Sequence, residues 1–240
     1  AAAAIGNFDG VHLGHQSVID VTRKAASAAN APLGIMTFEP HPRSYFAPDT
    51  APFRLMNATA KANRLEKLGV ERLYEVPFNA ALAALTPAEF AQTVIVDQLG
   101  LRHVVVGADF CFGKGRAGTA KDLQDFGTQL GFGVTIAPLL SLATAEVSST
   151  AIRQALTDGR PADAAEMLGH WHRIDGPVIT GEQRGRELGY PTTNMSIEGL
   201  HPPKFGVYVV EIEILTGPHK GTYGGAASMG TRPMFGENRP

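Results

Sequence analysis

The chain has 240 residues, which is enough for two small domains or one large domain. With 44% hydrophobic and 18% charged residues, the composition excludes a disordered, collagen-like or coiled-coil chain. The formal net charge of -2 provides no general positive field, so we do not expect a nucleic-acid partner.

A single cysteine, Cys111, excludes an internal disulfide and a zinc site built from several thiolates, and it fits a reducing compartment. The sequence has no apolar run near the ~20 residues that cross a bilayer, and its opening AAAAIGNFDG lacks a signal-peptide pattern. We therefore predict a cytoplasmic protein with no membrane partner. Because the opening lacks a methionine and starts inside an apparent strand, we also expect trimming at this end. The sequence leaves the oligomeric state open.

Short apolar runs alternate with amphipathic stretches from residue 1 to about residue 158, a pattern typical of βα units around a parallel sheet. The expected strands lead up to Ile5 and cover residues 33–38, 72–78, 103–110 and 134–139. The expected helices cover residues 15–29, 58–68, 87–99 and 120–130, and a fifth begins at Ser148 and ends at Gly159. Ligands of open α/β sheets bind at the carboxyl ends of the strands, so we expect the site there.

The pattern changes in the last third of the chain. Residues 159–170 predict a short helical connector, and period-two alternation with glycine-rich turns begins at about residue 171. This alternation indicates a second domain, a small antiparallel β-barrel.

The segment GNFDGVHLGHQ, residues 6–16, directly follows the first expected strand. Its glycines allow the backbone to turn tightly and to approach a ligand, and the following helix offers free N–H groups to an anion. His12 and His15 are three positions apart at this helix start, so both imidazoles can face one pocket and donate hydrogen bonds to a reacting phosphate. Solvated or capping histidines are the simpler interpretation, and a zinc site with His41 is a less favoured one.

Two further strands end in loops with polar or aromatic side chains. In TFEPHPR, residues 37–43, the prolines predict an extended, non-helical loop from which His41 and Arg43 bind phosphate or stack on a flat ring, unless the segment is only a rigid surface turn. In VVGADFCFGKGRAG, residues 105–118, Phe110 and Phe112 could cover a planar ring, although aromatic residues beside a strand more often belong to the core.

Two hydroxyl-rich motifs follow. SSTAIR, residues 148–153, places hydroxyls at a helix start with an arginine one turn later, which suits a second anion site, whereas a serine cap explains Ser148 or Ser149 alone. In YPTTN, Thr192 and Asn194 offer oxygen ligands on alternating positions, as Mg²⁺ prefers, and a simple turn is the alternative.

These motifs, in this order, resemble those of the bacterial bifunctional riboflavin kinase/FAD synthetase family over nearly the whole chain. The resemblance implies a Rossmann-like α/β nucleotidyltransferase domain over residues 1–158 and a flavokinase-like barrel over residues 171–240. The first would transfer AMP from ATP to FMN, giving FAD and pyrophosphate, and the second would phosphorylate riboflavin with ATP and Mg²⁺.

The resemblance also implies roles for particular residues. The catalytic set is Asn7, His12 and His15; the nucleotide-binding set is Gly6, Phe8, Asp9, Gly14, Ser149, Thr150 and Arg153; the flavin-binding set is His41, Arg43, Asp109, Phe110 and Phe112; and Thr192 and Asn194 would hold the metal.

The end of the chain departs from the family pattern. The family's kinase uses a glutamate base beyond the GTRPxF segment; Glu237 lies too close to that segment, and Met234 replaces a threonine. We therefore expect little kinase activity unless the natural chain continues past residue 240. Two other functions remain open: nucleotidyl transfer to another phosphorylated acceptor, and a flavin or nucleotide sensor without turnover.

Overall fold

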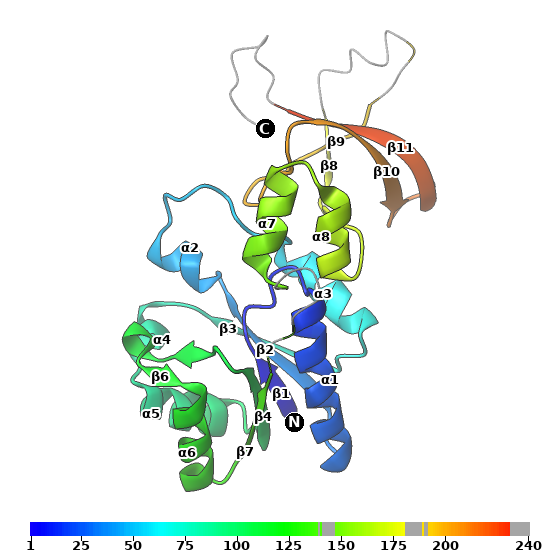
Figure 1. The fold of residues 1–240 in the computed structure, drawn as a ribbon. Coiled ribbons are helices and arrows are strands. Elements are labelled where there is room, and N and C mark those ends of the chain that lie inside the picture. The colour runs from blue at the N-terminus through cyan, green and yellow to red at the C-terminus, as the bar shows by residue number, and fades with distance from the viewer. Residues whose placement is uncertain (139, 141–146, 181–188, 190–191, 231–240) are drawn as a thin grey trace.

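A computed structural model describes residues 1–138, 140, 147–180, 189 and 192–230 (Figure 1). Five parallel strands form the central sheet in the order β3-β2-β1-β4-β7. They are β1 (Ala2–Ile5), β2 (Leu33–Glu39), β3 (Arg72–Pro77), β4 (His103–Gly107) and β7 (Gly133–Ala137). The predicted parallel α/β sheet is confirmed.

Helices connect these strands and cover both faces of the sheet. They are α1 (Leu13–Ala28), α2 (Pro42–Phe46), α3 (Ala58–Lys67), α4 (Ala80–Ala84), α5 (Pro87–Glu89), the π-helical segment η1 (Phe90–Gln98) and α6 (Ala120–Leu130). A short hairpin of β5 (Cys111–Phe112) and β6 (Gly118–Thr119) flanks the 3₁₀ turn η2 (Lys114–Arg116) between β4 and α6.

Alternation along β1 divides the core between the two faces. Ala3 and Ile5 belong to the cluster under η1 and α6, whereas Ala2 and Ala4 belong to the cluster under α1 and α3. All four are at most 3% exposed, so the strand is buried on both sides, as a parallel sheet requires.

Several local expectations need correction. The first helix begins at Leu13, two residues earlier than predicted, because His12 caps it. Residues 42–46 are helical rather than extended, because a proline at the first helical position has the required φ and has no N–H to leave unpaired. The helix expected over residues 87–99 is α5 followed by the π-helical η1. The hairpin β5–β6 and helix α4 are not among the sequence-based predictions.

Helices α7 (Ser149–Thr157) and α8 (Pro161–Leu168) pack on each other and on Leu55 and Val147. They lie between the sheet and the C-terminal strands (Figure 1). Those strands form two antiparallel ladders, β8 (Val178–Ile179) with β9 (Asn194–Met195) and β10 (Gly206–Ile214) with β11 (Gly221–Met229). The antiparallel prediction is thus confirmed, although the two ladders do not close into a barrel within the described residues.

No helix among the described segments combines the length and the apolar character needed to cross a membrane.

Candidate active site

The chain adds strands to the central sheet in two opposite directions, and these directions diverge between β1 and β4. From β1 the chain adds strands β2 and β3 on one side, and β4 and β7 lie on the other. Loops at the carboxyl ends of two such strands diverge and leave a crevice, which is the usual ligand site of an open α/β sheet. The loop of residues 6–12, which joins β1 to α1, begins at this point.

This β1–α1 loop has an unusual backbone. Phe8 (φ 51°), Gly10 (φ 88°) and Val11 (φ 42°) all have positive φ angles, which a β-branched residue such as Val11 rarely adopts. Phe8 and Val11 are almost fully buried, so packing holds them in this conformation. Strain of this kind concentrates at functional sites.

His12 and His15 lie together at the start of α1. The Nδ1 atom of His12 accepts a hydrogen bond from the backbone N–H of His15 at 3.3 Å, and the two rings stack with centroids 3.6 Å apart at 17°. Gly14 permits this arrangement, since a Cβ there would lie 3.1 Å from the His12 ring. The two imidazoles thus lie together at the helix start, where His12 is also the cap that the simpler interpretation expects, and their contact with a phosphate stays a prediction.

Both rings are neutral at pH 7. Burial lowers the pKa of His12 to about 4, and Asp9 only partly opposes this effect. Burial, His12 and Lys61 lower the pKa of His15 well below its ordinary value. Because Nδ1 of His12 accepts a hydrogen bond, its neutral ring carries the proton on Nε2. Nδ1 of His15 is buried without a hydrogen-bond partner among the described residues.

Asp9 ties the loop to distant parts of the chain. Its carboxylate accepts hydrogen bonds from the Leu55 backbone N–H at 2.8 Å and from Arg153 Nη2 at 2.6 Å. Ser149 Oγ donates to the Asp9 carbonyl oxygen at 2.8 Å. Ser149 and Arg153, which are predicted to bind nucleotide, therefore bind the β1–α1 loop in this structure. Thr150, from the same predicted set, is exposed on the first turn of α7.

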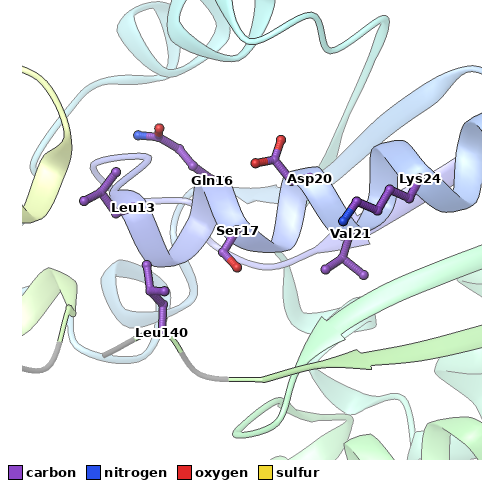
Figure 2. Close-up of a pocket in the computed structure, with 7 residues that line it drawn as sticks. All are labelled: Leu13, Gln16, Ser17, Asp20, Val21, Lys24 and Leu140. Atoms are coloured by element: carbon purple, nitrogen blue, oxygen red, sulfur yellow. The ribbon is translucent and has the colours of Figure 1, made fainter. Parts of the chain in front are cut away.

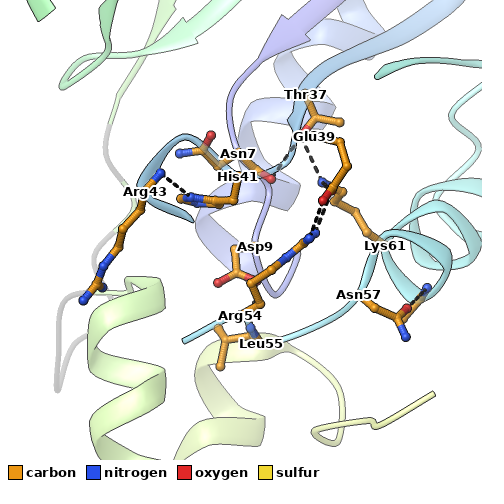
Figure 3. A network of polar contacts seen from close by, with 11 residues as sticks. Asn7, Asp9, Thr37, Glu39, His41, Arg43, Arg54, Leu55, Asn57 and Lys61 are labelled. Atoms are coloured by element: carbon orange, nitrogen blue, oxygen red, sulfur yellow. Dashed lines mark hydrogen bonds and ion pairs between the residues drawn. The ribbon is translucent and has the colours of Figure 1, made fainter. Parts of the chain in front are cut away.

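The second predicted loop lies beside the first. His41 caps α2 through a hydrogen bond from the Arg43 N–H to Nδ1 at 3.1 Å, and burial lowers its pKa to about 4. The Arg43 guanidinium lies 4.6 Å from the centroid of the Phe53 ring, and His41 contacts the same ring edge-on at 4.9 Å. Figure 3 shows His41 next to Asn7, whose side chain is exposed.

A polar network missed by the sequence analysis lies behind these loops (Figure 3). Arg54 binds both carboxylate oxygens of Glu39, at 2.5 and 2.9 Å. Lys61 donates to Thr37 Oγ1 at 3.1 Å. A signal was available, because Lys61 lies four residues before Leu65 and thus shares the apolar face of α3.

The third predicted loop follows β4, which lies on the other side of β1 from β2. Phe112 is 6% exposed and packs in the core against Phe90. Phe110 is half-buried and stacks on Phe112, with the two ring centroids 5.5 Å apart. Asp109 is exposed. The structure therefore places Phe112 where the core interpretation expects it.

Neither candidate metal site is a preformed cage. Thr192 is exposed and Asn194 begins β9; their oxygen atoms fit Mg²⁺, which keeps water and phosphate oxygens as its other ligands. In the part of the chain that the structure describes, no three His, Cys, Asp or Glu side chains group to hold a metal, so the zinc alternative has no support. Met234 and Glu237 lie outside the described residues.

A cavity of about 420 Å³ lies on the outer face of α1 (Figure 2). Leu13, Gln16, Ser17, Asp20, Val21, Lys24 and Leu140 line it. None of these residues belongs to the predicted site.

The parallel five-stranded sheet, covered by helices on both faces and with its switch point at β1 and β4, is the fold of an α/β nucleotidyltransferase-like domain. Comparison with protein families agrees with this class: residues 1–151 match the FAD synthetase family and residues 168–240 match the riboflavin kinase family. The chain belongs to the family of bifunctional riboflavin kinase/FMN adenylyltransferases. It transfers AMP from ATP to FMN, phosphorylates riboflavin, and uses Mg²⁺ with ATP.

Individual relatives support this assignment. The chain is 39% identical to the bifunctional riboflavin kinase/FMN adenylyltransferase of Escherichia coli K12, covering 95% of this chain and 72% of that protein. It is 38% identical to the protein of the same description in Bacillus subtilis, covering 99% and 74%. A crystal structure described as a macrolide-efflux protein from Streptococcus pneumoniae superposes with a TM-score of 0.82 at 34% identity, covering 96% of this chain and 74% of that one.

Proposed function

We propose that adenylyl transfer takes place at the β1–α1 loop, with His12 and His15 as the groups that bind the reacting phosphates of ATP. The observation that supports this proposal is the stacked, neutral imidazole pair at the N-terminus of α1. The partial positive charge and free N–H groups of this helix end attract phosphate oxygens, and neutral rings can donate hydrogen bonds without protonation.

In this reaction a phosphate oxygen of FMN attacks the α-phosphorus of ATP. The new P–O bond forms as the bond to the β-phosphate oxygen breaks, and pyrophosphate leaves. FMN supplies an ionised nucleophile, so the protein needs no general base. His12, His15 and Asn7 would instead orient the triphosphate and stabilise the charge that develops on its oxygens.

We assign to the other predicted residues roles that are compatible with their positions. Gly6, Gly14, Phe8 and Asp9 would shape the loop, and Thr150 would face the phosphates from α7. His41 and Arg43 would approach FMN from the second loop and Asp109 and Phe110 from the third. In the kinase part Thr192 and Asn194 would hold Mg²⁺, which when bound neutralises phosphate charge.

We also propose that residues 1–158 and 171–240 are two domains joined by residues 159–170, and that the protein acts in the cytoplasm without nucleic acid. Packing of α8 on α7 supports a connector that is fixed to the first domain.

Replacing His15 with alanine tests the catalytic proposal. We expect the rate of FAD formation from FMN and ATP to fall at least about a hundredfold, because a preorganised donor to the transferred phosphate is lost. Pyrophosphate release and chromatography of the flavin products measure this rate. The matched control is His219→Ala, which removes an exposed histidine from the β10–β11 connection.

His219→Ala should keep the rate of the unmodified protein. If His12→Ala and His15→Ala also keep that rate while remaining folded, the proposed mechanism is wrong.

A further inference from the structure

Lys61 is a buried charged side chain for which the proposed reaction has no role. The residue is 2% exposed and lies on α3, on the face that packs against the sheet. Its Nζ atom donates to Thr37 Oγ1 at 3.1 Å. Lysine is almost never buried to this extent unless it is paired, so its presence requires a compensating interaction or a function.

The hydrogen bonds around Lys61 have a fixed direction. An ammonium group can only donate, so the Thr37 hydroxyl oxygen accepts from Lys61. The Thr37 hydroxyl hydrogen is then free to point at the Asn7 carbonyl oxygen, to which it donates at 3.2 Å. This relay connects α3, β2 and the β1–α1 loop, and it fixes the backbone of Asn7 at the start of the loop (Figure 3).

The charge of Lys61 is only partly neutralised. The Glu39 carboxylate lies 4.0 Å from Nζ, but both of its oxygens are already bound by Arg54. Burial and Arg54 lower the pKa of Lys61, whereas the carboxylates of Glu39, Glu75 and Asp9 raise it.

The positive charge of Lys61 reaches two imidazoles of the site. It is one of the causes that lower the pKa of His15, where burial and His12 have larger effects. It also lowers the pKa of His41, less than burial, Arg54 and Arg153 do, whereas Asp9 raises that pKa. Excess positive charge in a buried position favours an anion at the adjacent edge of the sheet.

We propose that Lys61 is a positioning residue for adenylyl transfer, whose buried ammonium fixes the backbone of Asn7 through Thr37 and places a positive charge behind the β1–α1 loop. This inference rests on the proposed role of His12 and His15. It adds α3 to a site otherwise built from loops and from the first turns of α1 and α7.

Three substitutions and a matched control test the inference. Lys61→Met removes the charge and the donor, Lys61→Arg keeps a charge and a donor, and Thr37→Val breaks only the relay. Lys67→Met removes an exposed lysine from the same helix and serves as the control. We expect Lys61→Met to lower kcat for FAD formation about tenfold or more, with the KM for ATP and FMN within about twofold, because misplaced groups reduce turnover more than binding.

A second readout does not depend on turnover. In protein with isotope-labelled histidine, an NMR titration should show His15 protonating at a higher pH in Lys61→Met, because a positive neighbour is lost. Lys61→Arg should restore part of kcat and keep the lowered protonation pH of His15. Thr37→Val should lower kcat without moving the His15 titration.

Equal kcat in Lys61→Met and Lys67→Met would overturn the inference, as would an unchanged His15 titration together with no rescue by arginine. Should Lys61→Met not fold, Thr37→Val and Lys61→Arg still decide the matter, because a wild-type kcat in Thr37→Val excludes the relay. If His15→Ala lowers kcat while Lys61→Met and Thr37→Val keep the kcat of the unmodified protein, only this inference fails; full activity of His15→Ala refutes the proposed function itself.

Discussion

The Asp9 carboxylate is the side chain through which the β1–α1 loop is bound to α7. Asp9 and Arg153 lie 2.6 Å apart with side chains 5% and 15% exposed, so the pair is largely shielded from water. Removing one partner of such a pair leaves the other charge buried and unpaired. We expect Asp9→Asn, which keeps the shape of the side chain, to lower the free energy of unfolding by about 3 kcal/mol in urea denaturation.

A surface pair provides the comparison for this substitution. Lys121 and Asp125 lie 2.9 Å apart on α6 with side chains 72% and 57% exposed. Water screens such a pair, so Asp125→Asn should cost less than about 1 kcal/mol. Equal losses for Asp9→Asn and Asp125→Asn would show that the buried pair does not hold the loop.

At the level of elements, the β1–α1 loop depends on a glycine for both conformation and space. Gly10 has φ +88°, and a Cβ there would lie 2.8 Å from Leu55 Cδ1, which is itself buried. We expect Gly10→Ala to destabilise the protein by about 2–3 kcal/mol, from backbone strain and overpacking together. Thermal unfolding followed by circular dichroism measures the loss.

Gly115 separates these two causes. It has φ +64°, and a Cβ added there would have no atom within 4 Å, so Gly115→Ala tests strain alone. We expect a loss of about 1 kcal/mol there. If Gly10→Ala costs no more than Gly115→Ala, contact with Leu55 is not a constraint on the loop.

The sequence predicts the order of strands and helices because each element repeats its own apolar period over several residues. The proximity of His12 and His15 is also predictable, because the two residues lie within one turn of a helix start. Helix α2 is missed because the prolines of residues 37–43 suit an extended loop as well as a helix start.

The polar network behind the loops depends on tertiary packing and not on a local sequence pattern. Lys61 is 24 residues from Thr37 and 54 residues from Asn7, so its contacts depend on how α3 packs on β2 and on the β1–α1 loop. Apolar periodicity identifies the buried face of α3, but it does not give the partner across the interface. The candidate site was therefore predictable in its local motifs and not in the contacts that join them.

At the scale of the whole molecule, buried neutral histidines make stability depend on pH. Burial lowers the pKa of His12, His41 and His172 to about 4. Between about pH 4 and pH 6.5 the unfolded chain therefore binds protons that the folded chain does not, and the free energy of unfolding rises with pH across this window. We expect Tm to fall as the pH is lowered from 7 to 4.5, by differential scanning calorimetry.

His172 is the one of these three histidines that lies in residues 171–240, and its own contribution to the pH dependence can be tested by substitution. A pKa that changes from 6.5 in the unfolded chain to about 4 in the folded protein lowers the free energy of unfolding by about 3 kcal/mol at low pH, and this loss is complete only below pH 4. His172→Gln should weaken the dependence of Tm on pH, whereas His219→Ala, an exposed replacement, should leave it unchanged. A Tm that is equal at pH 7 and pH 4.5 would contradict the burial of neutral imidazoles.

The ties of Asp9 also bear on how the protein is made. Its partners Leu55, Ser149 and Arg153 lie 46, 140 and 144 residues further along the chain. Domains fold in order as the ribosome releases them, so β1 and its loop emerge early but lack their last anchors until α7 has left the exit tunnel. A nascent chain stalled before residue 148 should therefore fail to retain ATP, even with its sheet already translated.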